Sequence, residues 1–248
     1  MKTIAIILAA GSGRRLGSDL PKQFLEVEGR QVIEYTLEAF QKCAAVDEIC
    51  VVTHQNHIPE IKSIAIRNGF HKLRDVITGG ADRFSSSRAA LEFYANESPE
   101  TIIIFHDSVR PLIAPGTIEE CVKEMEYHDA VALGTPSTDT IWVLDSQTNI
   151  REIPPRGNLY NAQTPQCFRL GQISEAYSRA AADSGFVATD DCGVLLRYAP
   201  ECKIHVVKGS ADNLKITYKE DLSLLATLLK SRSLVHDKQD ESILSNKI

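Results

Sequence analysis

The stretch Thr3-Ile4-Ala5-Ile6-Ile7-Leu8-Ala9-Ala10-Gly11-Ser12-Gly13-Arg14-Arg15 decides the fold. Its first residues are almost all apolar, which is typical of a strand buried on both faces of a sheet. Small residues follow, and they allow a loop to come close to a ligand. Consecutive backbone N–H groups in such a loop form a concave site for anions. Because Arg14, Arg15 and Lys22 add positive charge, the stretch predicts a strand that ends in a polyphosphate-binding loop.

The glycine spacing of this loop differs from two common nucleotide-binding motifs. A dinucleotide-binding loop has the pattern G-x-G-x-x-G, but here the third glycine, Gly17, comes one residue late. A Walker A loop carries Lys followed by Ser or Thr after a glycine, and that pair is missing here. From the loop alone, an ordinary strand-to-helix turn with basic surface residues is an equal alternative.

The composition indicates a water-soluble α/β domain. The chain has 248 residues, of which 43% are hydrophobic and 24% are charged. Its net charge of −6 argues against a nucleic-acid partner, and no apolar run is long enough to cross a membrane. The six cysteines form no C-x-x-C pair, so reduced, buried thiols and a cytoplasmic location are expected.

Strand and helix patterns alternate along most of the chain. Apolar strands are predicted at 48–53 and 101–105, and helical spacing of apolar residues recurs at 33–40, 58–65 and 86–93. This alternation predicts a Rossmann-like α/β fold, with a mostly parallel sheet and helices on both faces. Residues 1–231 are expected to form a single domain, and the polar residues 232–248 a disordered tail.

Residues 136–157 interrupt this alternation. Two strand patterns, 140–144 and 149–153, flank a polar turn and predict a β-hairpin arm that projects from the sheet. Trp142, Val143 and Ile150 give the arm apolar residues that need a partner surface. We expect this partner to be a second copy of the chain, although an arm folded over its own domain is the alternative.

Two polar segments follow predicted strands and are candidates for binding. Asp107 lies just after the predicted apolar strand 101–105, where a carboxylate can hold Mg²⁺ against a triphosphate. The alternative is an ion pair between Asp107 and Arg110. The turn at Gly80 enters a helix that carries Arg83 and Ser86, and such a helix start can bind an anion or a ribose. An ordinary capped turn is the simpler alternative for this second segment.

Two further cations are candidates for phosphate contacts. Arg156 follows two prolines, which suits a bidentate contact with a phosphate, and Lys215 can reach a phosphate as a point charge. Solvated side chains are the common alternative for both. The seven histidines show no metal-binding spacing, and the absence of G-x-S-x-G argues against a serine hydrolase.

Together these segments resemble the alditol-phosphate cytidylyltransferases. The resemblance covers residues 3–230 and is carried by 8–15, 21–24, 79–86, 106–111, 139–140, 156–166 and 213–217. It implies that CTP and a polyol phosphate react to give a CDP-polyol and pyrophosphate, with Mg²⁺ as cofactor. It also implies a homodimer in which the arm reaches the partner subunit.

The resemblance assigns a role to each motif residue. As catalytic cations it implies Arg15, Lys22, Arg156 and Lys215. For nucleotide binding it implies Leu8, Ala9, Ala10, Gly11, Ser12, Gly13, Gly80, Ala81, Arg83, Ser86 and Ser108. For the polyol phosphate it implies Asp107, Arg110, Asp139, Thr140 and Thr164, together with Arg156 and Lys215. Asp107 is also the implied metal ligand.

The substrate is predicted from departures within these motifs. Val109 and Trp142 resemble the enzymes that use D-ribitol 5-phosphate, which is the predicted substrate. The alternative is 2-C-methyl-D-erythritol 4-phosphate, which Ala9-Ala10-Gly11 and Thr189-Asp190-Asp191 favour.

Two interpretations outside this reaction class remain. An NAD-dependent oxidoreductase needs an acidic residue at the end of the second strand, but Glu34 lies in a helical pattern. The retained Arg15, Lys22, Asp107 and Lys215 argue against an inactive binding protein.

Overall fold

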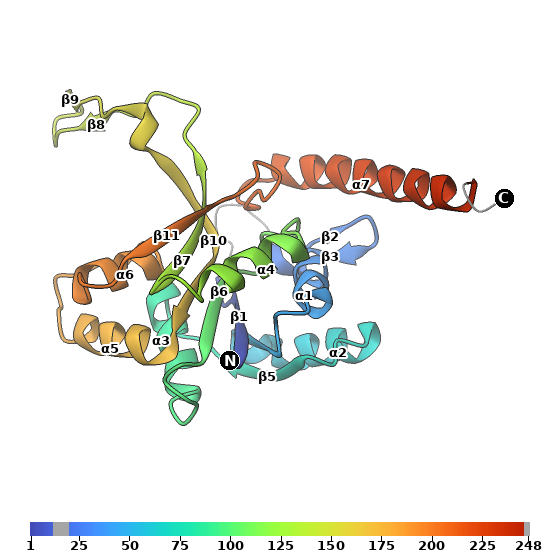
Figure 1. Cartoon of the computed structure of the whole chain (residues 1–248), viewed down its shortest axis with the longest axis horizontal. Coiled ribbons are helices and arrows are strands. Elements are labelled where there is room, and N and C mark those ends of the chain that lie inside the picture. Colours follow the sequence, from blue (N-terminus) through green and yellow to red (C-terminus); the bar gives the residue numbers. More distant parts are fainter. Residues whose placement is uncertain (12–19, 246–248) are drawn as a thin grey trace.

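A central sheet with helices on both faces forms the body of the molecule (Figure 1). The computed structural model describes residues 1–11 and 20–245, with side chains up to Arg232. Within that part, seven strands form one sheet in the order β11-β7-β10-β6-β1-β4-β5. The strands are β1 Thr3–Ala9, β4 Glu48–Thr53, β5 Leu73–Thr78, β6 Ile102–Asp107, β7 Ala130–Pro136, β10 Tyr160–Arg169 and β11 Ile204–Lys208. Only β10 runs antiparallel to its neighbours, so the predicted mostly parallel α/β sheet is confirmed.

The helices cover the two faces in two groups of three. On one face lie α1 Val32–Lys42, α2 Ile58–Asn68 and α4 Pro115–Glu124; on the other lie α3 Arg83–Phe93, α5 Leu170–Ala181 and α6 Asp191–Tyr198. The residues of β1 alternate between the two cores, because successive side chains of a strand point to opposite faces. Ala5 and Ile7 pack under the first group, and Ile4 and Ile6 under the second. This double burial explains the unbroken apolar sequence of β1.

The order of the strands creates a binding position at the end of β1. The chain passes from β1 to β4 on one side and later returns to β6 on the other side of β1. Ligands of open α/β sheets bind outside the carboxyl ends of the strands at such a reversal. Leu8 pairs in register with Asp107, so the loops after β1 and β6 leave the sheet side by side.

Strand β10 is an element that the sequence pattern did not predict. It lies between β6 and β7 and contains Gln163, Pro165 and Gln166, which are unusual inside a sheet. The register with β7 shifts between Ala162 and Gln166, so the strand accommodates Pro165 at an irregular point of the ladder. The side chains of Gln163 and Gln166 are buried, and they bind neighbouring segments rather than solvent.

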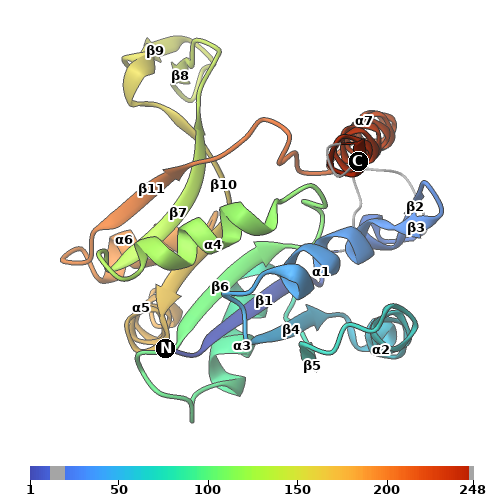
Figure 2. The same cartoon turned by 45° about the vertical axis from the view of Figure 1, so that its right-hand side comes forward.

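The arm and the last helix extend away from the sheet (Figures 1 and 2). In the arm, β8 Val143–Leu144 pairs antiparallel with β9 Ile150–Glu152. A second small hairpin, β2 Glu26–Val27 and β3 Arg30–Gln31, precedes α1. Helix α7 spans Glu220–Ser245, so it includes residues 232–245 of the expected disordered tail, and residues 246–248 lie outside the described part of the chain.

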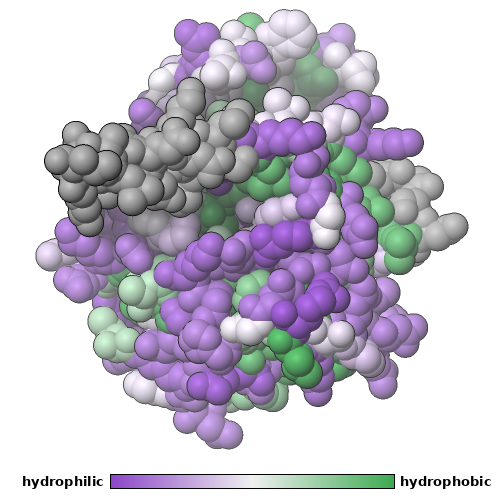
Figure 3. All heavy atoms as spheres, turned by 90° about the vertical axis from the view of Figure 1, so that its right-hand side faces the viewer, coloured by the Kyte–Doolittle hydropathy of each residue, from purple (hydrophilic) through white to green (hydrophobic). Residues whose placement is uncertain are grey.

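The face toward which α7 points is mainly hydrophilic, with smaller hydrophobic areas (Figure 3). In the described part of the chain, each helix is too short or too polar to cross a lipid bilayer.

Candidate active site

The end of β1 and the residue after it, Ala10, pack closely against neighbouring segments. The side chain of Gln23 donates a hydrogen bond to the carbonyl of Ala9 at 2.6 Å. A Cβ atom on Gly79 would lie 2.8 Å from the Cβ of Ala10, so only glycine permits this approach. The backbone N–H of Ser108 donates to the carbonyl of Leu8 at 3.1 Å, which joins the exits of β6 and β1. Leu8, Ala9, Ala10 and Ser108, four of the predicted nucleotide-binding residues, therefore lie around one corner of the sheet.

The turn before α3 reaches the same edge of the sheet from β5. The backbone N–H of Gly80 donates to the hydroxyl of Ser86 at 3.2 Å. That hydroxyl in turn donates to the carbonyl of Asp82 at 2.7 Å, and the side chain of Asp82 caps the helix. Ala81 is exposed in this turn. Gly80 and Ser86, which the sequence placed in one motif, are thus in direct contact.

A buried carboxylate among cations is the central charged feature of this corner. Asp107 Oδ2 lies 3.2 Å from Arg110 Nε and 3.0 Å from Lys215 Nζ. Asp107 Oδ1 lies 3.7 Å from Arg83 Nε. The side chain of Asp107 is only 11% exposed. The structure therefore brings together four predicted site residues that are up to 132 positions apart in the sequence (215 − 83).

The cations keep Asp107 ionised. Burial alone raises the pKa of this carboxyl, but Lys215, Arg83 and Arg110 outweigh burial and hold the pKa well below its usual value. A carboxylate that stays charged at neutral pH is a poor general acid or base there. In this arrangement Asp107 instead fixes the positions of three positive groups.

Asp191 is a site residue to which the sequence analysis assigned no role. Its Oδ2 lies 2.6 Å from Arg83 Nη2, and its side chain is fully buried. The hydroxyls of Tyr177 and Ser87 both donate to its Oδ1, at 2.6 and 2.8 Å. Burial disfavours the charged form of Arg83, yet Asp191 and Asp107 raise the pKa of Arg83 above its usual value. In the sequence analysis, the segment Thr189-Asp190-Asp191 was used only as an indication of the substrate.

Residues 213–217 cross the site and bind residues from three other segments. The amine of Lys22 donates to the carbonyl of Ile216 at 2.9 Å. The guanidinium of Arg110 donates to the carbonyl of Asn213 at 2.9 Å. The amide of Asn213 donates to the carbonyl of Thr164 at 3.0 Å. Lys22 and Lys215 are therefore held by the same short segment.

Other predicted residues are not part of this cluster. Arg156, Asp139 and Thr140 lie at the base of the arm and are exposed, and Arg156 donates to the carbonyl of Thr138 at 3.3 Å. Ser12, Gly13 and Arg15 lie outside the described residues, so their predicted roles stay predictions.

The surroundings of Asp107 do not fit the predicted direct bond to Mg²⁺. One of its oxygens is held by Arg110 and Lys215, and the other faces Arg83. With Asp191 included, two carboxylates face three cations, so the cluster has an excess of positive charge. A divalent cation prefers carboxylates, phosphates and water without competing cations. We therefore do not assign Asp107 as a metal ligand.

A second group of possible metal ligands lies at the opposite end of the sheet. The ligand atoms of Glu124, His128 and His205 lie within 4.8 Å of one another. The two imidazole rings, however, stack face to face with centroids 4.0 Å apart and planes 3° apart. Their nitrogen lone pairs therefore lie in parallel planes and do not converge on one point, and we assign no metal site here.

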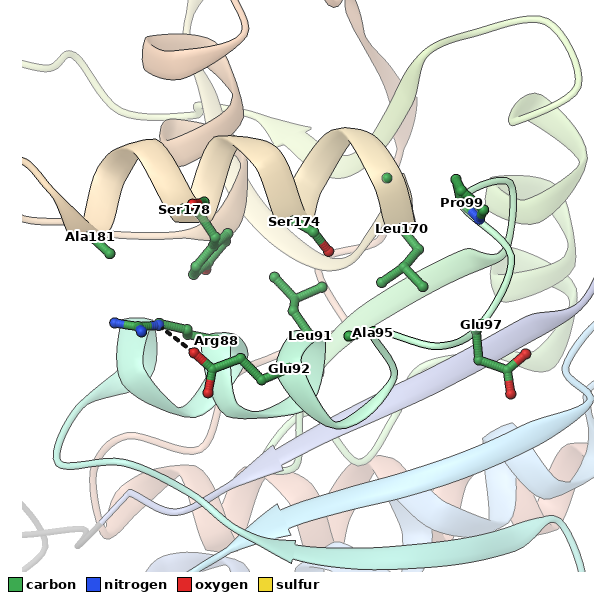
Figure 4. A pocket seen from close by; sticks show the side chains of 12 residues that line it. Arg88, Leu91, Glu92, Ala95, Glu97, Pro99, Leu170, Ser174, Ser178 and Ala181 are labelled. Carbon is green, nitrogen blue, oxygen red and sulfur yellow. Dashed lines mark hydrogen bonds and ion pairs between the residues drawn. The ribbon is translucent and has the colours of Figure 1, made fainter.

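A cavity of about 370 Å³ between α3 and α5 lies apart from the predicted residues (Figure 4). Leu91 and Leu170 form its apolar part, and Ser174 and Ser178 line it from α5. Tyr177 contributes to its wall while its hydroxyl is bound to Asp191. The cavity therefore lies behind the charged cluster and contains none of the cations predicted to bind phosphate.

Comparisons with known proteins identify the family of the chain. The family model described as IspD, 2-C-methyl-D-erythritol 4-phosphate cytidylyltransferase, matches residues 3–231. A protein of that name from Thermobifida fusca is 39% identical over 93% of this chain and 94% of its own length. A bifunctional ribulose 5-phosphate reductase/CDP-ribitol pyrophosphorylase from Haemophilus influenzae is 37% identical over 94% of this chain and 49% of its own length.

Solved structures show the same fold. The crystal structure of 4-diphosphocytidyl-2C-methyl-D-erythritol synthase from Anaerococcus prevotii has a TM-score of 0.81 and 29% sequence identity, covering 92% of this chain and 96% of that one. The family match includes the sheet, the charged cluster and the arm. The chain therefore belongs to the 2-C-methyl-D-erythritol 4-phosphate cytidylyltransferase family and is a cytidylyltransferase, one of the nucleotidyltransferases.

Proposed function

We propose that this enzyme transfers the cytidylyl group of CTP to 2-C-methyl-D-erythritol 4-phosphate and releases pyrophosphate. The family match over residues 3–231 supports the substrate. The observation that carries the chemistry is the set of cations gathered around Asp107 at the carboxyl end of β6. Such fixed positive charge suits a reaction in which negative charge builds up between two phosphate groups.

This substrate replaces D-ribitol 5-phosphate, which the sequence motifs favoured. The family model and most of the similar proteins carry the methylerythritol phosphate name. Val109 and Trp142, on which the prediction of D-ribitol 5-phosphate depended, give it little support in the structure. Val109 is only 5% exposed and packs with Ile216 in a small apolar cluster, so its side chain does not line the charged site. Trp142 lies exposed in the arm.

D-Ribitol 5-phosphate remains the second candidate substrate. It is supported by the Haemophilus influenzae relative, whose name includes CDP-ribitol pyrophosphorylase and whose matching half resembles this chain almost as closely as the Thermobifida fusca protein.

The proposed reaction is an in-line displacement at phosphorus. A phosphate oxygen of the polyol attacks the α-phosphorus of CTP, and the bond from that phosphorus to the pyrophosphate oxygen breaks. The attacking phosphate is already an anion at neutral pH, so no general base is required. Lys22 and Arg15 are proposed to stabilise the triphosphate, and Arg110 and Lys215 the polyol phosphate. Mg²⁺ is proposed to enter with the triphosphate, as the magnesium complex of CTP.

The arm is proposed to form a homodimer contact. It carries several exposed apolar side chains, which a monomer would leave in water. They are Ile141, Trp142, Leu144, Ile150 and Ile153. In this dimer Asp139, Thr140 and Arg156 would reach the polyol phosphate in the site of the partner subunit, because they lie outside the cluster of their own chain.

The deciding experiment measures pyrophosphate release with CTP, Mg²⁺ and each of the two polyol phosphates. We expect a higher kcat/KM with 2-C-methyl-D-erythritol 4-phosphate than with D-ribitol 5-phosphate. The reverse order would refute the first substrate and support the second. If neither compound released pyrophosphate above the background seen with CTP alone, both proposed substrates would be wrong.

A further inference from the structure

His106 is a fully buried residue of β6 directly below the charged site. Its side chain is inaccessible to solvent, and its ring lies 4.9 Å from that of Phe40. It precedes Asp107 in the chain, and its two ring nitrogens face two different segments. One nitrogen lies 3.1 Å from the hydroxyl of Thr164 on β10, and the other lies 3.4 Å from the carbonyl of Arg110.

The neighbours of His106 determine the position of its proton. A backbone carbonyl can only accept, so the hydrogen bond to Arg110 requires a proton on Nε2. A neutral ring then leaves Nδ1 as an acceptor, and the hydroxyl of Thr164 must donate to it. The same hydroxyl accepts the backbone N–H of Asp107 at 3.1 Å. All donors and acceptors in this chain of bonds match one tautomer.

We propose that His106, as a neutral imidazole with its proton on Nε2, is a positioning residue that holds Asp107 and Arg110 in their reactive arrangement. The hydrogen bonds run from the Asp107 N–H to Thr164, from Thr164 to His106, and from His106 to the Arg110 carbonyl. Residues 107–110 are thereby fixed at both ends. This inference rests on the proposed function, in which Arg110 binds the polyol phosphate.

The surroundings of the ring keep it neutral. Burial lowers the pKa of His106 to about 3, although Asp107 opposes this shift; Arg110 and Lys215 add to it. An imidazolium would carry a proton on Nδ1 and could no longer accept from Thr164. The network therefore exists only with the uncharged ring, and it persists throughout the neutral pH range.

The network also changes the role of Thr164. The sequence resemblance implied that Thr164 contacts the polyol phosphate. Its residue is only 3% exposed, and the hydrogen of its hydroxyl is used by His106. The hydroxyl of Thr164 therefore has no hydrogen left to donate to a substrate, and in the proposed network it acts on the substrate through residues 107–110.

A spectroscopic experiment tests the tautomer without any need for turnover. Histidine side chains labelled with ¹⁵N are observed by two-bond ¹H–¹⁵N correlation, and the His106 signal is identified by its loss in His106→Gln. We expect a protonated Nε2 and an unprotonated Nδ1, unchanged between pH 8 and pH 5. A proton on Nδ1, or titration of this signal within that range, would overturn the proposal.

A kinetic experiment tests the positioning role. Thr164→Ser keeps the hydroxyl and is the matched control for Thr164→Val, which removes it. His106→Gln keeps a donor near the position of Nε2 but has no acceptor at the position of Nδ1, to which Thr164 donates. We expect Thr164→Val and His106→Gln each to lower kcat/KM for the polyol phosphate about 10-fold or more, the scale of one lost buried hydrogen bond. The KM for CTP should stay within about twofold, and Thr164→Ser should resemble the wild type.

The double variant separates positioning from general damage to the fold. Because both single variants break the same chain of bonds, Thr164→Val combined with His106→Gln should be little worse than either alone. Independent, multiplying effects, or equal losses toward CTP and the polyol phosphate, would contradict the proposal. An inactive wild-type enzyme would refute the proposed function, whereas the tautomer experiment would still decide the state of His106.

Discussion

Replacing Asp191 by Asn tests the buried ion pair that holds Arg83. The substitution keeps the shape of the side chain and an oxygen that accepts from Tyr177 and Ser87. It removes the negative charge 2.6 Å from the Arg83 guanidinium. Loss of one partner of a buried pair costs about 3–5 kcal/mol, because the remaining charge stays buried without compensation.

The expected loss lies at the lower end of this range. The side chain of Arg83 is 24% exposed and still has Asp107 at 3.7 Å, so it is not left entirely without compensation. We expect a decrease of about 3 kcal/mol in the free energy of unfolding. For a chain of this size, that corresponds to a decrease of about 6–12 °C in Tm.

Urea and thermal unfolding at pH 7 measure this effect. Asp183→Asn is the matched control, because it breaks a much more accessible ion pair, with Arg197, and should leave Tm close to that of the wild type. Adding Arg83→Met to Asp191→Asn should recover part of the lost stability, since the unpaired buried cation is then removed. An Asp191→Asn protein with the Tm of the wild type would refute this account of the pair.

Further predictions concern stability, catalysis and assembly. Because the pKa of His106 is lowered from 6.5 to about 3, the unfolded chain takes up a proton below pH 6.5 that the folded chain refuses. Stability should therefore fall between pH 6 and pH 4 by up to about 1.4 kcal/mol per unit from this group, and urea unfolding of His106→Gln should lack that contribution. Lys22→Ala should lower kcat by about 100-fold or more, as for loss of one donor to a transition state, and near-wild-type turnover would exclude that role. Arg156→Ala should raise the KM for the polyol phosphate and leave the KM for CTP unchanged; the opposite pattern would assign Arg156 to the nucleotide. Trp142→Asp should shift the oligomer toward the monomer in gel filtration, whereas an unchanged elution volume would argue against the arm contact.

Local patterns were sufficient to predict the parallel part of the sheet. The strands at 3–9, 48–53 and 102–107 are apolar because they are buried on both faces, and this burial is visible in each segment alone. Asp107 was predicted as a site residue because it ends such a strand. The alternative interpretation, an ion pair between Asp107 and Arg110, is also confirmed, and Lys215 joins this pair.

The missed features depend on contacts between distant residues. Strand β10 is polar and contains Pro165, so its place between β6 and β7 is set by bonds to other segments and not by its own pattern. Asp191 belongs to the charged cluster because it forms an ion pair with Arg83, which lies more than a hundred positions earlier in the chain. Val109 shows a different limit of sequence motifs: in the sequence this residue indicated substrate choice, but its side chain belongs to an apolar cluster.

The crossing of the site by residues 213–217 has a consequence for how the enzyme is made. A ribosome delivers these residues after every strand of the sheet has already been synthesised. A nascent or truncated chain that stops at Lys208 would possess β1 and β6, yet Asp107 would lack one of its cations and Lys22 would lack its carbonyl partner. If Lys22 and Lys215 act on the substrates as proposed, a fragment that stops at Lys208 is therefore expected to keep the strands of the sheet and to lack activity.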